Sequence, residues 1–336
     1  VLAYYFNAAD ILLSSFQKDE IPSIYMATLK ESFISEPQWI FSLLCGVTME
    51  IATFMKWVGD NWTEERSPRL GHIFFDYESG WENNEAAKEF SKEFGIEFVG
   101  YEIVPLTCVD ASAELLRLAG KKTDWIYVTL VGVAGVVVVK DVARLRLQEM
   151  GIKMCGYSAQ LGEVMLNVVG KDANGWYIVR GVPCMTEPQE LPDLDILIDA
   201  VKRYRGWGPE KVNVDYVAGW VCSQVFVEAI RMAIDRVGFD NLTGRAVRDS
   251  LASMKDFETG LGLPVTMTDK RPFIWPRVRM NQVREVKIWA ISDWMEPAYP
   301  ISSHFSNMSD IWRRLTDPRR NFAKSITTLG SKQLVR

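Results

Sequence analysis

The sequence predicts an α/β fold made of two doubly wound parallel sheets, which form two lobes joined by a hinge. Between Arg69 and Val182, short apolar runs alternate regularly with amphipathic runs at helical spacing. The apolar runs show little internal alternation of apolar and polar residues, which is typical of strands buried on both faces of a sheet. With 336 residues, the chain is longer than one average domain, so a second α/β lobe is expected.

The region between Arg69 and Val182 carries the clearest pattern. Strands are expected at 70–75, 96–103, 125–131, 152–156 and 175–180, and helices at 81–94, 111–119, 135–150 and 160–169. One helix therefore separates each strand from the next. Right-handed crossovers of this kind place the strands parallel in one sheet, with helices covering both of its faces.

The flanking regions repeat the pattern less regularly. Before the central region, strands are expected at 1–6, 21–26 and 39–45, and helices at 11–18 and 49–62. After it, helices are expected at 194–204, 218–237 and 243–254. Thr243 is the predicted N-cap of the last helix, because its hydroxyl can accept from a free backbone N–H. Further strands are expected at 265–268 and 286–292.

Polar, proline-containing breaks at 64–68 and 186–192 separate these regions. We expect residues 1–45 and 190–260 to form the first lobe, and residues 69–182 and 264–297 to form the second. A fully apolar strand is usually central and needs neighbours on both sides. A chain that begins on such a strand is expected to lack preceding βα units, so the first lobe is predicted to be incomplete at its N-terminus.

The last segment, residues 298–336, is expected to be an atypical basic tail outside both lobes. From Ile311 onward it contains seven Lys or Arg residues and one acidic residue. We interpret this excess of positive charge as a solvated basic face, in preference to a docking site for a membrane or a permease.

The composition argues against several classes of function. The net charge of −5 disfavours nucleic acid as a partner. No continuous apolar run approaches the roughly 20 residues that span a bilayer, and any signal peptide is expected to lie outside this chain. The five cysteines are far apart and form no CxxC pair, so neither a disulfide framework nor a metal site is expected.

The sequence also lacks a catalytic signature, so the chain is not expected to be an enzyme or to carry a cofactor. There are two histidines, and His72 lies within an expected strand, where a core histidine is the preferred interpretation over a catalytic base. There is no G-x-S-x-G, P-loop or H-E-x-x-H motif. Gly132-Val-Ala-Gly135 follows a strand and opens a helix, but the complete dinucleotide-binding pattern is missing.

Ligands of an open α/β sheet bind beyond the carboxyl ends of its strands. The expected ends lie at 7–8, 27–28, 76–81, 130–132 and 157–158. Several of them lead directly into helix N-termini, whose free N–H groups favour anionic groups. These ends are therefore predicted to contribute to one binding site.

The order and spacing of these elements resemble the type I periplasmic solute-binding proteins, specifically the branched-chain amino-acid (leucine, isoleucine, valine) group of ABC transporters. The resemblance runs from Val1 to about Trp294. The segment Phe75–Trp81 is similar to the family's Asp-x-x-Tyr-Gly segment, and Val217–Ile230 is similar to its long helix after the second crossing. It implies two lobes joined by three crossings, a solute bound between them, and a precursor with a signal peptide.

The resemblance also implies a location and a partner, namely a periplasmic or extracellular protein that delivers its solute to an ABC permease. Residues are carried over by position: Asn7 falls at a first-lobe serine, Ala27 and Thr28 in the loop that holds the solute carboxylate, and Ser79 at a tyrosine. Together with the strand-end argument, the candidate ligand contacts are Asn7, Ala8, Ala27, Thr28, Tyr77, Ser79, Trp81, Val131, Gly132 and Tyr157.

Family members that bind amino acids place an acid near the position of Tyr157 to meet the solute ammonium. This chain has no carboxylate at 156–159, and an unpaired ammonium in a closed cleft would be costly. We therefore expect a small hydrophobic or aromatic carboxylate, or alternatively a branched-chain amino acid. Asp76 and Glu78 could still meet an ammonium, but we interpret them as turn acids that face solvent.

An alternative function is a ligand-sensing module of a receptor or regulator with the same fold. Neighbouring genes would separate the two, since transport predicts permease and ATPase genes whereas sensing predicts a kinase or regulator gene.

Overall fold

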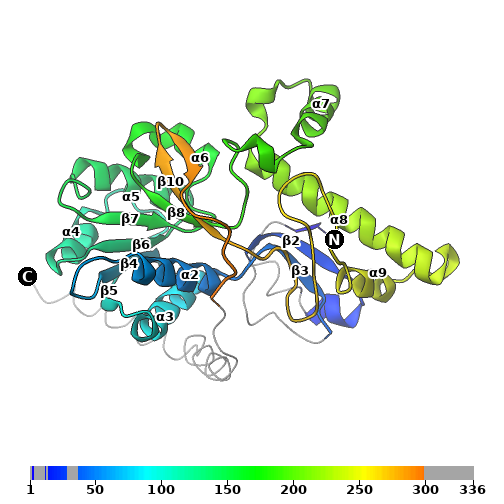
Figure 1. Cartoon of the computed structure of the whole chain (residues 1–336), viewed down its shortest axis with the longest axis horizontal. Helices are drawn as coiled ribbons and strands as arrows, with labels where there is room; N and C mark the ends of the chain where they lie inside the picture. The colour runs from blue at the N-terminus through cyan, green and yellow to red at the C-terminus, as the bar shows by residue number, and fades with distance from the viewer. Residues whose placement is uncertain (1, 4–11, 13, 29–36, 299–336) are drawn as a thin grey trace, which may run out of the picture. The chain divides into compact units, whose positions relative to one another are not determined.

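The computed structural model describes residues 2–3, 12, 14–28 and 37–298, and its strands form two separate sheets. Parallel strands with helices between them confirm the α/β fold (Figure 1). Within the described residues, one sheet has four strands in the order β1-β2-β3-β9, and the other has seven in the order β11-β10-β8-β7-β6-β4-β5.

The seven-stranded sheet is mixed. Its parallel strands come from the central region and are β4 (Arg69–Phe75), β5 (Glu97–Val104), β6 (Trp125–Thr129), β7 (Lys153–Gly156) and β8 (Tyr177–Arg180). Two antiparallel strands, β10 (Arg279–Arg284) and β11 (Lys287–Ala290), extend the sheet beyond β8. Each predicted strand of the central region is thus present, with its ends shifted by a few residues.

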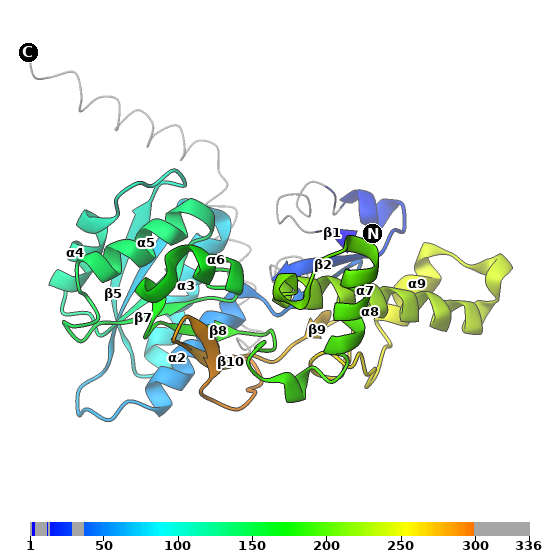
Figure 2. The ribbon, with the colours of Figure 1, turned by 90° about the horizontal axis from the view of Figure 1, so that it is seen from above.

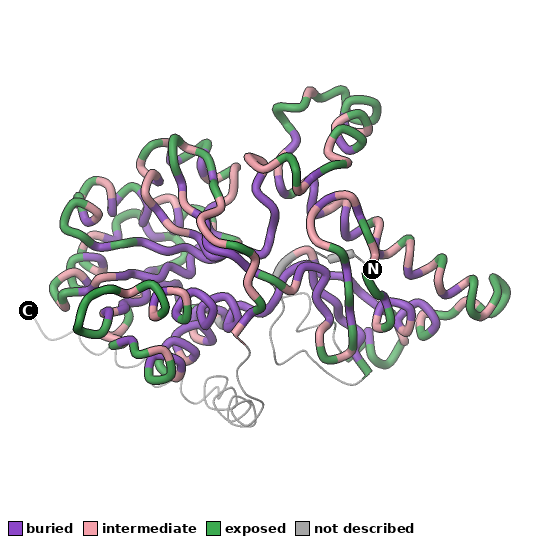
Figure 3. The backbone as a smooth tube through the Cα atoms, viewed as in Figure 1, coloured by how far each residue is buried: buried purple, intermediate pink, exposed green. Residues whose placement is uncertain are grey.

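Helices cover both faces of this sheet. Successive strand residues point to opposite faces, so each strand contributes side chains to two cores. Trp125 and Tyr127 of β6 pack in one core with α2 (Val47–Asp60) and α3 (Glu78–Glu93). Ile126 and Val128 pack in the other core, which contains residues of α4 (Ser112–Gly120), α5 (Gly132–Arg144) and α6 (Glu163–Val169). Figure 3 shows that the central strands of the sheet, which lie between these helix layers, are mostly buried.

The four-stranded sheet is parallel throughout and consists of β1 (Leu2–Ala3), β2 (Ser23–Thr28), β3 (Ile40–Leu44) and β9 (Phe273–Trp275). Its helices are α7 (Leu194–Arg205), α8 (Val214–Val237) and α9 (Gly244–Leu251) (Figure 2). Ile24, Phe41 and Ile274 pack in one core with these helices. The predicted N-cap is confirmed, since the Thr243 hydroxyl accepts from the Ala246 N–H at 3.2 Å.

Helix α8 is long and apolar enough, by length and composition alone, to cross a membrane. It has 24 residues, and its buried stripe, which includes Val221, Val225, Ala229 and Ala233, packs in the core beside the four-stranded sheet. The helix begins at Asn213, whose side-chain oxygen accepts from the N–H groups of Asp215 and Tyr216. This packing is that of a core helix in a globular fold.

Three expectations about the C-terminal strands need correction. The strand predicted at 265–268 is wrong, because this segment makes only isolated bridges, Phe257 with Val265 and Thr268 with Arg271. Strand β9 was missed because it is short and lies between two prolines, and β10 because its sequence is rich in polar residues. Moreover, β9 pairs with β3 in the four-stranded sheet, so residues 264–297 do not all join the seven-stranded sheet.

The predicted division into lobes stays a prediction, although the sheets give it a frame. The regions 1–45 and 69–182 contribute strands to different sheets. The basic segment lies outside the described residues from Tyr299 onward, and so do residues 4–11, which include the second half of the predicted first strand.

Candidate functional site

The carboxyl ends of three neighbouring parallel strands meet at one edge of the seven-stranded sheet. The register pairs Phe74 of β4 with Thr129 of β6, and Val128 of β6 with Gly156 of β7. The loops at 76–81, 130–132 and 157–160 therefore leave the sheet at the same edge, as expected for a ligand site in this fold class.

A cleft of about 640 Å³ lies at this edge and is lined by residues of both sheets and their helices. Its size is that of small-molecule sites in proteins. Most of the lining is aliphatic or thioether side chain: Met26, Leu43, Leu44, Val133, Val136, Val164, Met165, Val168, Val182 and Val214. The side chains that bring polar groups are Ser158, Gln160, Arg180 and Asp215.

Gly132 is the predicted contact that lines this cleft directly. It is the first residue of α5 and has φ of +59°, a conformation that glycine adopts at little cost. Val131, the N-cap of α5, is half-buried and packs against the cores on both faces of the sheet. The N-terminus of α5 thus lies at the cleft, and its contact with a ligand stays a prediction.

Tyr157 is buried in the core beneath the cleft and is only 5% exposed. Its neighbours Ser158 and Ala159 line the cleft instead. The Ser158 hydroxyl donates to the buried carboxylate of Glu50 at 2.5 Å, and the Ser158 N–H donates to the same carboxylate at 3.1 Å. The hydroxyl also accepts from the Gly181 N–H at 3.2 Å, so Ser158 is held firmly at the cleft wall.

Tyr77, Ser79 and Trp81 do not line the cleft. The Trp81 ring packs edge-on against Phe74 and Tyr101, with centroids at 5.2 and 5.5 Å, and its indole N–H donates to Asp76 at 2.7 Å. This places Trp81 beside β5, the edge strand farthest from β8.

Local packing also holds Tyr77 and Ser79, the two predicted contacts that precede Trp81. Ser79 is 6% exposed, and Tyr77 stacks on Phe75 with ring centroids 5.4 Å apart. These two residues, like Trp81, are therefore not part of the cleft lining.

The remaining predicted contacts belong to the four-stranded sheet. Asn7 and Ala8 lie outside the described residues. Ala27 and Thr28 end strand β2, where Thr28 pairs with Leu44 of β3. Their neighbours Met26 and Leu44 both line the cleft, while contact of Ala27 and Thr28 with a ligand stays a prediction.

Arg180 is a cleft residue that the sequence reasoning missed. It ends strand β8, and its side chain is only 1% exposed. Its Nε and Nη1 atoms are buried without a hydrogen-bond partner, and the nearest carboxylate oxygen, on Glu163, is 3.6 Å from Nη1. A charged residue at the carboxyl end of a buried strand was the available signal, because the strand-end rule applies to β8 as well.

Gln160 is a second missed residue. It is fully buried, it lines the cleft, and neither its amide nitrogen nor its amide oxygen has a hydrogen-bond partner. Buried polar groups are nearly always paired, so these unpaired atoms mark the part of the cleft that can accept a polar group of a ligand.

Asp215, in the first turn of α8, brings a carboxylate to the cleft. Desolvation raises the pKa of this carboxyl, repulsion from Glu163 raises it further, and attraction to Arg180 partly offsets both. No acid lies within two residues of Tyr157 in the sequence, but α8 supplies one to the cleft from far away in the chain.

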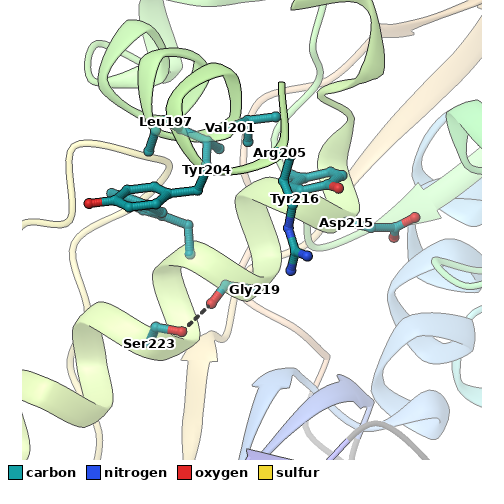
Figure 4. Close-up of a pocket in the computed structure, with 10 residues that line it drawn as sticks. Leu197, Val201, Tyr204, Arg205, Asp215, Tyr216, Gly219 and Ser223 are labelled. Carbon is teal, nitrogen blue, oxygen red and sulfur yellow. Dashed lines mark hydrogen bonds between the residues drawn. The ribbon is translucent and has the colours of Figure 1, made fainter. Parts of the chain in front are cut away.

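A smaller groove of about 400 Å³ lies between α7 and α8 (Figure 4). The rings of Tyr204 and Tyr216 flank it, and the Ser223 hydroxyl donates to the Gly219 carbonyl at 2.8 Å. Asp215 borders this groove too, but its carboxylate points away from Tyr204 in Figure 4. Across the described residues, no group of three or more His, Cys, Asp or Glu side chains is arranged to hold a metal ion.

The fold and the cleft between strand ends are those of a solute-binding protein, and the sequence comparison gives the family. The chain belongs to the periplasmic binding protein family, whose sequence profile matches residues 1–284. A search of curated proteins finds none that matches this sequence.

Solved structures share the fold at low sequence identity. A branched-chain amino-acid ABC transporter protein from Thermus thermophilus with bound valine has a TM-score of 0.77 at 19% identity, over 88% of this chain and 78% of its own. A fatty acid ABC transporter substrate-binding protein from Thermomonospora curvata has a TM-score of 0.74 at 17% identity, over 88% and 74%. An extracellular ligand-binding receptor from Rhodopseudomonas palustris HaA2 has 0.69 at 15%, over 86% and 81%.

Proposed function

We propose that this chain is the solute-binding component of an ABC transporter, located in the periplasm or outside the cell. In this proposal it binds a small hydrophobic or aromatic carboxylate, or a branched-chain amino acid, and closes on it by a hinge motion. The closed form then delivers the solute to a membrane permease. The observation that carries the proposal is the mainly apolar cleft of about 640 Å³, to which both sheets contribute residues.

The chemistry of the cleft supports a ligand with one polar end. Aliphatic and Met side chains dominate its walls, while a single guanidinium, a buried amide and a carboxylate supply charge and hydrogen bonds. Sites of this composition use the apolar area for affinity and a few polar groups for orientation. A carboxylate joined to an apolar body matches that division.

Two of the structurally similar proteins are described by ligands that share this chemistry. The Thermus thermophilus protein holds valine, and the Thermomonospora curvata protein is named for fatty acids. Both ligands join a carboxylate to an aliphatic part, although only valine carries an ammonium. This supports the carboxylate as the common element of the proposal.

The presence of Asp215 in the cleft keeps amino acids among the proposed ligands. Its carboxylate could accept from a solute ammonium, the role for which the sequence showed no residue near Tyr157. We keep the expectation that the ammonium is not required, because Arg180 and Gln160 offer donors to a carboxylate.

The ten predicted contacts and the two lobes remain part of the proposal. The presence of Gly132 and Met26 in the cleft lining supports the contacts proposed at the start of α5 and the end of β2. Tyr77, Ser79 and Trp81, at the N-cap and in the first turn of α3, would contact a solute only after a rearrangement of this helix start.

Calorimetry on the purified protein tests this function. Leucine, its deaminated analogue 4-methylpentanoate, and simple aromatic acids are titrated separately, and native mass spectrometry checks for a retained small molecule. We expect micromolar binding of at least one acid. If leucine binds and every analogue without nitrogen fails, the ammonium is required and the amino-acid alternative is correct. If no acid binds at millimolar concentration, the proposed ligand class is wrong.

A further inference from the structure

Arg180 is buried more completely than its hydrogen bonds justify. Its side chain is 1% exposed, yet Nε and Nη1 have no hydrogen-bond partner and the Glu163 carboxylate is 3.6 Å from Nη1. A buried charge is costly unless it is paired and hydrogen-bonded. The guanidinium therefore has unused donors at the wall of a cleft that it helps to line.

Arg279 shows that the fold can pair the terminal nitrogens of a buried arginine with its own acids at nearly the same place. It lies opposite Arg180 in the register of β8 and β10, and it is 4% exposed. Its two terminal nitrogens donate to the two carboxylate oxygens of Glu190, both at 2.8 Å, whereas its Nε, like that of Arg180, has no hydrogen-bond partner. Two arginines side by side in one sheet thus differ in whether the protein itself provides the acceptor.

We propose that Arg180, together with the amide of Gln160, binds the carboxylate of the solute and gives the cleft its preference for acids. This rests on the proposed function, because it assigns a residue to the ligand class stated there. Guanidinium and carboxylate match in shape and can form two parallel hydrogen bonds. Such a carboxylate would supply the missing acceptors of Arg180.

Gln160 supports the assignment independently. Both polar atoms of its side chain are buried and unpaired, and the residue lines the same cleft. An amide N–H in the same cleft as a guanidinium offers a second donor for a carboxylate, and a neutral donor adds no further charge. Unpaired donors on two residues of one cleft are best explained by one acceptor that the described part of the chain does not supply.

The neighbouring acids limit where a carboxylate can bind. Asp215 also lines the cleft, Glu163 lies 3.6 Å from Arg180, and the pKa of Asp215 is raised by desolvation and by Glu163. A solute carboxylate placed near Asp215 would be repelled. Arg180 is the one cation in the described lining, so the acid end of the solute is directed to β8 and the apolar body to the aliphatic walls.

The test compares matched ligands and matched variants. Each acid that binds the wild-type protein is paired with its primary amide, which keeps the shape and removes the charge. Arg180→Gln removes the guanidinium from the cleft. Arg284→Gln is the control, because it makes the same change at an exposed position on β10 of the same sheet. Calorimetry gives the dissociation constants of acid and amide for all three proteins.

We expect the wild type and Arg284→Gln to prefer the acid over the amide by roughly 10- to 150-fold, the value of a charged hydrogen bond. Arg180→Gln should bind acid and amide alike. An unchanged preference in Arg180→Gln would overturn the assignment while leaving solute binding intact. Equal binding of acid and amide by the wild type would overturn it too. A wild type that binds no acid would refute the proposed function itself.

A second variant separates this role from a structural one. Arg180→Lys keeps the positive charge but loses the paired donors, so its preference for the acid should fall between those of the wild type and Arg180→Gln. The thermal unfolding midpoint without ligand should be unchanged in Arg180→Lys. A drop in that midpoint with an unchanged preference for acids would show that Arg180 serves the fold and would reject the proposal.

Discussion

Two buried arginines, Arg180 and Arg279, face each other across strands β8 and β10 and have opposite surroundings. Both terminal nitrogens of Arg279 donate to the Glu190 carboxylate, Glu187 lies 2.7 Å from Nη2, and the Trp294 ring lies 4.3 Å from the guanidinium carbon. Beside Arg180 there is one carboxylate at ion-pair distance, that of Glu163, whose oxygen lies 3.6 Å from Nη1.

The difference between them follows from the segments that pack over each strand. Glu187 and Glu190 lie in the proline-containing crossing after β8, and they fold back onto β10. Among the residues that the structure describes, no acidic segment of this kind packs over Arg180, which lines the cleft. The comparison teaches that burial alone does not tell whether a charged residue serves the fold, whereas the count of its acceptors does.

The largest loss of stability should come from replacing Arg279, the arginine that is paired with acids of the chain. Arg279→Met removes the partner of two acidic groups that are 17% and 23% exposed. Leaving buried charges unpaired is strongly destabilising, so the free energy of unfolding should fall by about 3 kcal/mol. Urea denaturation followed by tryptophan fluorescence measures it. A loss smaller than about 1 kcal/mol would mean that this cluster behaves as a surface ion pair and that the comparison fails.

His72 extends the comparison to a buried base that can lose its charge. It is fully buried on β4, its Nε2 lies 2.9 Å from the Thr129 hydroxyl, and desolvation lowers its pKa from 6.5 to about 3. Below pH 6.5 the side chain of His72 takes up a proton in the unfolded chain, whereas in the folded protein it stays neutral. Stability should therefore fall as the pH falls, by about 2 kcal/mol between pH 6.5 and 5.

Urea denaturation at a series of pH values checks this contribution, with His72→Gln as the control. The variant keeps a polar side chain but cannot titrate, so its stability should vary less over the same interval. Equal pH dependence of the two proteins would show that His72 does not take up a proton on unfolding in this range.

A smaller effect is expected when the unsatisfied arginine is made apolar. Arg180→Met has a similar length and removes buried donors that lack acceptors. Replacing a poorly paired buried charge by an apolar residue is often neutral or stabilising, so without ligand the free energy of unfolding should change by less than about 1 kcal/mol. The measurement is the same as for Arg279→Met. Similar losses in both variants would erase the distinction between the two arginines.

The smallest effect concerns Asp215, which is exposed to the cleft. Its pKa is raised by desolvation and by Glu163, so the charged form costs some stability at neutral pH. Asp215→Asn should therefore stabilise the protein slightly, by roughly 0.5 kcal/mol or less because the group is exposed. The gain should appear above the usual Asp pKa, near 3.9, and vanish below it. Destabilisation at pH 7 would contradict the sign of this shift.

The sequence predicted the layered fold well because its signal is local and repeated. In β6, Trp125 and Tyr127 alternate with Ile126 and Val128, and both pairs are apolar because helices cover both faces. Strand β10 escaped detection for the opposite reason: its Arg279 and Asn281 are buried by partners distant in the chain. Nothing in the local pattern announces such burial.

The site was predicted only in part, because strand ends are local features whereas unpaired acceptors and donors are not. Gly132 and the end of β2 follow from the order of strands and helices. Arg180 and Asp215 both line the cleft, although β8 belongs to the seven-stranded sheet and α8 packs beside the four-stranded one. No spacing in the sequence indicates that these two residues lie in one site. Trp81 was predicted to contact the ligand because it follows β4, yet its ring packs against Phe74 and Tyr101 outside the cleft lining.

The hydrogen bonds of Ser158 bear on where the backbone can bend. They tie Glu50, just after the crossing from β3, to Gly181, at the start of the crossing after β8. Any closure that keeps these bonds must rotate the chain on the far side of both tie points, before Val47 and after Gly181. Spectroscopic labels meant to report closure therefore belong beyond those points, since a pair attached within the tied segments would move as one rigid piece and record nothing.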